Sequence, residues 1–205
     1  MYRLCRENRI LLPRNKKKIR HHSRISINRI LTKPNQLWQF DIKYGYIHGE
    51  NRFFYLLAFE DVFSKEIVSY HIGKSCTAKD LKITFEHAIS RRGCDLNQLV
   101  IRSDNGPQMT SNQFRDYTNG LVLHEFIPPR CPDKNAFIES FFSIYEIQFL
   151  QVHYFKSFFE AYYKTVDYIE FYNNERLHGS IKKLPPVEFK MRYEAGEFGI
   201  MECRA

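Results

Sequence analysis

Residues 37–59, LWQFDIKYGYIHGENRFFYLLAF, decide the fold. In residues 37–47 aromatic and β-branched side chains alternate with polar ones, which is the period of a strand with one buried face. Residues 48–51, HGEN, carry a turn signal, and the apolar run at 53–59 predicts a second strand. The stretch therefore predicts a β-hairpin.

The residues after the hairpin predict an α/β domain. From the apolar spacing and the turn signals we expect strands at 66–72, 99–102 and 122–127 and helices at 77–92, 112–117, 133–155 and 157–173. Thr77 is suited to cap the first helix and Gly93 to end it. This order is typical of a ribonuclease H-like fold, in which helices flank a mixed five-stranded sheet. Such a fold alone does not identify the chemistry.

Three carboxylates stand where a phosphoryl-transfer enzyme needs metal ligands. Asp41 lies in the middle of the first strand, where aspartate is a poor strand former. Asp104 follows a strand in IRSDNG, and Glu139 lies early in a helix in NAFIESFF. Taken singly, they have ordinary alternatives as an ion-pair partner of Lys43, a turn former and a solvated residue, respectively. Taken together, they can hold two Mg²⁺ ions about 3.5–4 Å apart for an in-line displacement at phosphorus.

The sequence blocks around these acids resemble a known family. The blocks are NQLWQFDIKY at 35–44, DVFSKEIVSY at 61–70, RSDNGPQMTSNQF at 102–114, IPPRCPDKNAFIESFFSI at 127–144 and YIEFYNNERLHGSIKKLPPVEF at 168–189. They are similar to the integrase core of the OrfB-type transposases of bacterial insertion sequences, which are relatives of retroviral integrases. The resemblance covers residues 2–193.

This resemblance implies an activity and its ligands. Asp41, Asp104 and Glu139 match the family's acidic triad, so they would be both catalytic and metal-binding residues, with two Mg²⁺ ions or Mn²⁺ in substitution. The implied reaction is strand cleavage at the ends of a mobile element, followed by attack of a 3′-hydroxyl on target DNA. The implied partners are element ends and target DNA, further copies of the chain in a homo-oligomer, and a separate helix-turn-helix protein of the same element.

Positive charge is concentrated at the N-terminus. Residues 1–34 contain 11 Lys or Arg and one Glu, whereas the rest of the chain has 20 basic and 22 acidic residues. Such an arm gains affinity for nucleic acid by releasing counterions from phosphates, and a solvated tail is the alternative. The residues from which we expect DNA contacts are Lys16, Lys17, Lys18, Arg20, Arg130, Lys134, Asn135, Arg176 and His178.

The domain organisation follows from the same features. We expect a basic arm at 1–34, an integrase-like core at 35–193 and a tail at 194–205. The first residues, MYRLCRE, resemble the end of a helical DNA-binding module that relatives carry in full, so we expect an N-terminal truncation. Because no apolar run suits a membrane span or a signal peptide, we expect a cytoplasmic bacterial protein that joins the nucleoid when bound to DNA.

Two departures from the family pattern keep other functions open. The chain has one residue fewer than relatives between Phe114 and His124, and it has Ile147 and Gln148 where relatives often carry charged residues. We expect an active transposase. The alternative is a truncated, catalytically inactive DNA-binding remnant or regulator of transposition. A third function, that of a ribonuclease H, would show itself by a preference for RNA:DNA hybrids.

Overall fold

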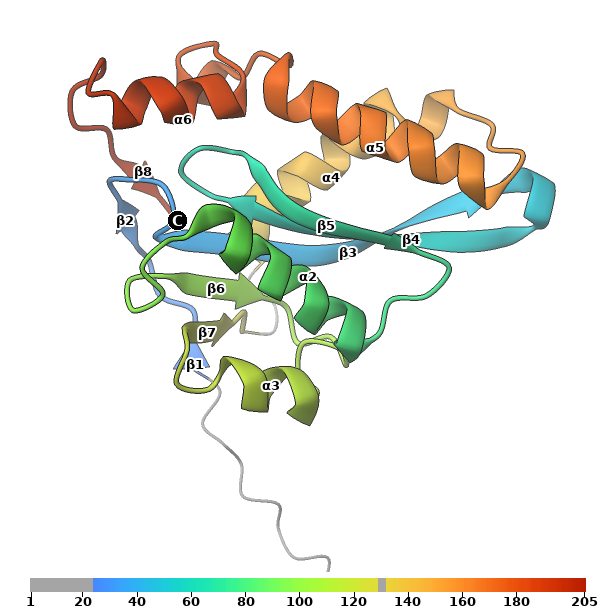
Figure 1. Cartoon of the computed structure of the whole chain (residues 1–205), viewed down its shortest axis with the longest axis horizontal. Coiled ribbons are helices and arrows are strands. Elements are labelled where there is room, and N and C mark those ends of the chain that lie inside the picture. Colours follow the sequence, from blue (N-terminus) through green and yellow to red (C-terminus); the bar gives the residue numbers. More distant parts are fainter. Residues whose placement is uncertain (1–23, 129–131) are drawn as a thin grey trace, which may run out of the picture.

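A mixed β-sheet forms the centre of the molecule (Figure 1). The computed structural model describes residues 24–128 and 132–205. Within them, six strands lie in the order β1-β7-β6-β3-β4-β5. Their bounds are Arg24–Ile25 for β1, Leu37–Ile47 for β3, Arg52–Asp61 for β4, Ile67–Gly73 for β5, Val100–Ser103 for β6 and Leu123–Phe126 for β7. Strands β3, β4 and β5 are antiparallel neighbours, whereas β6 pairs parallel with β3, and β7 lies parallel between β6 and β1.

Helices cover both faces of this sheet (Figure 1). One face carries α2 (Ala78–Arg92) and α3 (Asn112–Thr118), and the other carries α4 (Ala136–Gln148) and α5 (Phe158–Asn174). Successive side chains of a strand point to opposite faces. Phe40 of β3 therefore packs in the cluster with α2 and α3, and Ile47 of the same strand packs in the cluster with α4 and α5.

The predicted ribonuclease H-like α/β architecture is confirmed. Five strands are those expected from the sequence, and the two-residue strand β1 adds a sixth at the edge, where Ile25 pairs with Phe126. Helix α2 begins at Thr77, whose side chain accepts a hydrogen bond from the amide of Asp80, and Gly93 ends the helix in the left-handed conformation with φ 55°. None of the helices in the described ranges is long and apolar enough to cross a membrane.

The prediction of one helix at 133–155 is wrong. A 3-10 turn (Pro132–Asn135) precedes α4, which ends at Gln148, and a second 3-10 turn follows at Leu150–Val152. The helix ends because the chain must bring Phe155 back to the end of β3, where it forms a bridge with Ile47 and accepts a hydrogen bond from Gly49. The approach is so close that a Cβ at Gly49 would lie 2.0 Å from the carbonyl oxygen of Lys156.

Residues 29–31, near the start of the described chain, lie beside its C-terminal residues. Strand β2 (Ile30–Leu31), in the segment expected to be a basic arm, pairs with β8 (Cys203–Arg204), in the segment expected to be a tail. Helix α6 (Pro186–Glu194) packs in the same apolar cluster as Leu31, through the buried ring of Phe189. Residues 24–34 and 194–205 are thus part of the folded structure. The stretch MYRLCRE, which resembles the end of a helical DNA-binding module, lies outside the described residues.

The short connection between Phe114 and His124 leaves the sheet intact. Helix α3 ends at Thr118, whose carbonyl accepts hydrogen bonds from Leu121 and Val122. Strand β7 then pairs in register with β6 over all four of its residues. The rings of Phe114 and His124 pack 5.6 Å apart, centroid to centroid. Helix α3 and strand β7, on either side of this loop, are thus both joined to the rest of the fold.

Candidate active site

Asp41 lies on the face of β3 that is covered by α4. Its side chain is half-buried and accepts a hydrogen bond at 2.7 Å from the backbone amide of Ile42. Burial, helped by the charges of Asp104 and Glu139, raises the pKa of Asp41 to about 6, although the hydrogen bond from Ile42 lowers it. Burial and neighbouring negative charges destabilise the ionised form of a carboxyl group, and a nearby cation stabilises it.

Asp104 is placed at the same edge of the sheet by the register of two parallel strands. Gln39 of β3 pairs with Arg102 of β6, so Asp41 and Asp104 each lie two residues beyond a paired position. The backbone amide of Gly106 donates to Asp104 Oδ1 at 2.9 Å. Asn105 donates from Nδ2 to the carbonyl of Ile127 at 2.7 Å, which ties this turn to the end of β7. Asn105 and Gly106 thus shape the turn that presents Asp104.

Glu139 lies in the first turn of α4, which a buried glutamine fastens to β3. Gln39 Oε1 accepts hydrogen bonds from the amides of Phe137 and Ile138, both at 3.2 Å. Its Nε2 donates to the carbonyl of Lys134 at 2.9 Å. Gln39 precedes Asp41 by two residues and points to the same face of the strand. One side chain therefore positions the helix that carries Glu139 relative to the strand that carries Asp41.

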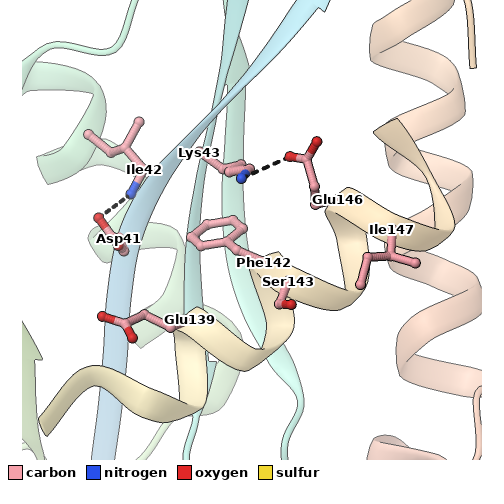
Figure 2. A pocket seen from close by; sticks show the side chains of 8 residues that line it. All are labelled: Asp41, Ile42, Lys43, Glu139, Phe142, Ser143, Glu146 and Ile147. Atoms are coloured by element: carbon pink, nitrogen blue, oxygen red, sulfur yellow. Dashed lines mark hydrogen bonds and ion pairs between the residues drawn. The ribbon is translucent and has the colours of Figure 1, made fainter. Parts of the chain in front are cut away.

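A groove runs along α4 from the acids (Figure 2). Asp41 and Glu139 line it together, and its lining continues with Lys43, Phe142, Ser143 and Glu146. Asp104 is exposed outside this lining, close enough for its charge to act on Asp41. No three His, Cys, Asp or Glu side chains in residues 24–128 and 132–205 are grouped so that they could hold a metal ion. The acids nevertheless offer only hard carboxylate oxygens, which are the donors that Mg²⁺ prefers.

A buried ion pair and its hydrogen bonds hold the segment that precedes α4. Arg102 is fully buried and pairs with Glu125 at 3.1 Å. It also donates to the carbonyls of Ile27 and Lys134, at 2.7 and 3.3 Å. The carbonyl of Lys134 is therefore held by both Gln39 and Arg102. Neither residue is predicted from the sequence. Arg102 stands in a short apolar strand, which was a signal, whereas Gln39 fits the alternation of β3 and gives no local signal.

The residues expected to contact DNA fall into three groups. Lys16, Lys17, Lys18, Arg20 and Arg130 lie outside the described residues. The Lys134 ammonium group bonds to the side chain of Asn28, and Asn135 is buried with its Oδ1 unbonded to any described residue. Arg176 lies against Gln148 and His178.

His178 is buried against Tyr172, with ring centroids 4.7 Å apart. Burial, followed by the charge of Arg176, lowers the pKa of His178 to about 4, so its ring is neutral at physiological pH. These surroundings favour structural roles for Asn135 and His178 over direct phosphate contacts.

Profiles of known protein families match most of the described chain. Two family profiles, both described as Integrase core domain, match the chain over residues 32–131 and 121–186. Together they include all three acids.

Related sequences come from bacterial insertion elements. The uncharacterized 39.2 kDa protein of insertion element IS476 from Xanthomonas euvesicatoria is 29% identical, over 78% of this chain and 45% of that protein. The uncharacterized 31 kDa protein of IS600 from Shigella sonnei is 30% identical, over 79% of this chain and 59% of that protein. A transposase for IS904 from Lactococcus lactis is 27% identical, over 80% and 65%. The chain thus spans about half to two thirds of the length of these relatives.

Solved structures share the fold. A chain of a simian T-cell lymphotropic virus intasome in complex with the PP2A regulatory subunit B56 gamma aligns with TM-score 0.62 and 19% identity, over 84% of this chain and 60% of that chain. The HTLV-2 integrase catalytic core domain in complex with magnesium, in its trimeric form, aligns with TM-score 0.54 and 19% identity, over 77% and 97%. The likeness at these identities concerns the fold.

Proposed function

Because the chain belongs to the integrase core domain family, we propose that it is a transposase that cuts DNA at the ends of an insertion sequence and joins these ends to target DNA. The observation that carries the proposal is that Asp104 and Glu139, from two other elements, lie close enough for their charges to act on the half-buried Asp41. Burial and the charges of the other two acids raise the pKa of Asp41. Three carboxylates that repel one another are the arrangement expected where a divalent cation completes a phosphoryl-transfer site.

The chemistry would use the acids as metal ligands. Asp41, Asp104 and Glu139 would hold two Mg²⁺ ions, or Mn²⁺ in substitution, which supply charge neutralisation for an in-line displacement. The protein's own contribution is placement. Ile42 orients Asp41, Gly106 orients Asp104, and the bonds of Gln39 fix the first turn of α4.

The proposed reaction has two steps. Water attacks a phosphorus atom at the element end, and the bond from phosphorus to the 3′-oxygen breaks, which frees a 3′-hydroxyl. This hydroxyl then attacks a phosphorus atom of target DNA, and the 3′-oxygen of the target strand leaves. The number of phosphodiester bonds is conserved in the second step, so joining needs no external energy source.

Further parts of the proposal concern partners and organisation. Residues 1–34 would hold DNA electrostatically beside a catalytic core at 35–193, with 194–205 as the tail that pairs with β2. Transposition brings two ends together, so we propose a homo-oligomer, with a separate helix-turn-helix protein of the same element as a partner. The protein would act in the bacterial cytoplasm, on the nucleoid.

The test is a strand-cutting and joining assay. A labelled duplex that carries the DNA flanking the chain's own gene is incubated with a plasmid target, with and without MgCl₂. We expect nicked ends and end–target joints only when the metal is present. Binding without cutting would instead identify an inactive DNA-binding protein, and cleavage confined to an RNA:DNA hybrid would identify a ribonuclease H.

A further inference from the structure

The groove contains a lysine that the proposed chemistry does not use. Lys43 Nζ lies 2.8 Å from Glu146 Oε2, and the two side chains are 32% and 36% exposed. Figure 2 shows this ion pair further along the groove than the two acids, with Phe142 between Lys43 and Glu139. Among the described residues that line the groove, Lys43 is the one cation, and the same lining contains the carboxylates of Asp41, Glu139 and Glu146.

Lys43 and Glu146 lie further along the same strand and helix that carry Asp41 and Glu139. Lys43 follows Asp41 by two residues in β3, so both side chains point to the same face, about 7 Å apart along the strand. Glu146 follows Glu139 by seven residues in α4, which places it two turns, or about 10 Å, further along one side of the helix. A DNA strand whose phosphodiester reaches the acids passes the ion pair within about two or three nucleotide steps of ~3.4 Å.

We propose that Lys43 binds a DNA phosphate in this groove and that Glu146 competes with the phosphate for Lys43. This inference rests on the proposed function. The carboxylate of Glu146 repels a phosphate of a strand that passes it. A neighbouring cation that can leave Glu146 and bind the phosphate removes this repulsion. An ion pair this open to water contributes little net stabilisation, and a phosphate can therefore replace Glu146 at small cost. The ammonium group of lysine suits the exchange, because it is a point charge with three donors on a flexible stem.

Competition predicts that the two partners act in opposite directions on DNA binding. Lys43→Met should weaken the affinity for a short labelled duplex about two- to fivefold and lower the slope of log affinity against log salt by about 0.9, the value of one lost phosphate contact. Glu146→Gln frees the lysine and should tighten binding about two- to fivefold. Lys43→Arg, which keeps the charge, should bind as the unaltered residue does.

The measurement is a fluorescence anisotropy titration of the full chain at several NaCl concentrations in MgCl₂. All proteins carry Asp104→Asn, so that the duplex stays intact, and melting curves establish that each variant is folded. The matched control is the pair Lys82–Glu86 on α2, on the opposite face of the sheet, with a separation of 3.7 Å and side chains 34% and 41% exposed. Lys82→Met and Glu86→Gln report the effect of the same charge changes away from the groove.

The double variant separates competition from general repulsion. If Glu146 acts through Lys43, then in the Lys43→Met background Glu146→Gln should tighten binding no more than Glu86→Gln does. The inference is wrong if both changes in the groove weaken binding and lower the melting temperature alike, because the pair is then only a tie between β3 and α4. It is also wrong if the groove pair and the control pair respond equally. Absence of any DNA binding by the intact chain would overturn the proposed function as well.

Discussion

Gln39 accepts a hydrogen bond at 3.2 Å from the backbone amide of Ile138, the residue before Glu139, although the two lie 99 positions apart in the chain. Because Gln39 precedes Asp41 by two residues, this contact sets the position of one acid relative to the other. Gln39 acts through these neighbours and is a positioning residue. Both polar atoms of its side-chain amide form hydrogen bonds, because Oε1 accepts from Ile138 and Nε2 donates to the carbonyl of Lys134.

Gln39→Met should therefore impair both folding stability and metal use. The change leaves the amides of Phe137 and Ile138 without their acceptor, whereas the carbonyl of Lys134 keeps its bond from Arg102. It should lower the free energy of unfolding by about 1–3 kcal/mol. We also expect a higher Mg²⁺ requirement for strand cutting, measured as the concentration for half-maximal rate. Gln39→Glu, which keeps the acceptor atom for Ile138, should retain more activity than Gln39→Met. A variant that is less stable but cuts with an unchanged Mg²⁺ requirement would show that Gln39 is structural only.

Asp41→Asn should stabilise the metal-free protein while removing its activity. The pKa of Asp41 is raised from 3.8 to about 6 in the folded state, chiefly by burial. The carboxyl group is neutral in both states below about pH 4, and above about pH 6 its charge disfavours the folded state. The free energy of unfolding should thus fall between these pH values, by about 1–3 kcal/mol, and Asp41→Asn should remove this decline. Denaturant titrations in EDTA measure it, and an equal decline in the variant would contradict the prediction.

Without metal, Asp41→Asn should be more stable than the unaltered chain, and addition of Mg²⁺ should make the unaltered chain the more stable of the two. A cation that binds the folded state alone raises its stability in proportion to the logarithm of the cation concentration. We expect the melting temperature of the unaltered chain to rise with MgCl₂ and that of Asp41→Asn to rise less. Equal shifts in both proteins would place the bound cation away from Asp41.

Gly106→Ala should disturb Asp104 without unfolding the protein. A Cβ at Gly106 would lie 3.0 Å from Asp104 Oδ1 and 3.3 Å from Met109 Sδ, so the carboxylate would have to move by a few tenths of an ångström. Since misplacement of a reacting group by 1 Å costs on the order of 100-fold, we expect strand cutting to slow by about two- to tenfold. Gly179→Ala is the control, because no atom lies within 4 Å of its Cβ position. Equal rates for the two variants would argue against a role for this turn.

Much of the fold could be predicted from the sequence because the signals are local. The β3–β4 hairpin follows from the alternation in residues 37–47, the turn signal and the apolar run at 53–59, and α2 follows from its apolar spacing and its caps. The end of α4 could not be predicted, because it depends on the contact of Phe155 with Ile47 across the molecule. Strands β1 and β2 are two residues long and exist only through long-range pairing, which leaves no periodicity to detect.

The candidate site was predictable to a smaller extent. Asp41 is a poor strand former and Asp104 follows a strand directly, but each has an ordinary alternative, and only the resemblance to the family's acidic triad assigns them together with Glu139. The register of β3 and β6 places Asp41 and Asp104 at equivalent positions beyond a paired residue. The clamp from Gln39 and the network of Arg102 required partners distant in the sequence to be known. The pairing of Lys43 with Glu146 likewise depends on how α4 lies against β3. Local patterns thus indicate which residues are unusual, and tertiary structure decides what they contact.

The most direct measurement compares DNA cutting and joining by the unaltered chain, Asp104→Asn and Asp116→Asn, each with MgCl₂ and a labelled element-end duplex. Asp116 is an exposed residue of α3, so its substitution controls for loss of one negative charge. We predict metal-dependent nicking and joining by the unaltered chain and by Asp116→Asn, and neither product with Asp104→Asn. Cutting that survives Asp104→Asn, or binding by all three proteins with no cutting by any, would contradict the assignment of Asp41, Asp104 and Glu139 as a working catalytic triad.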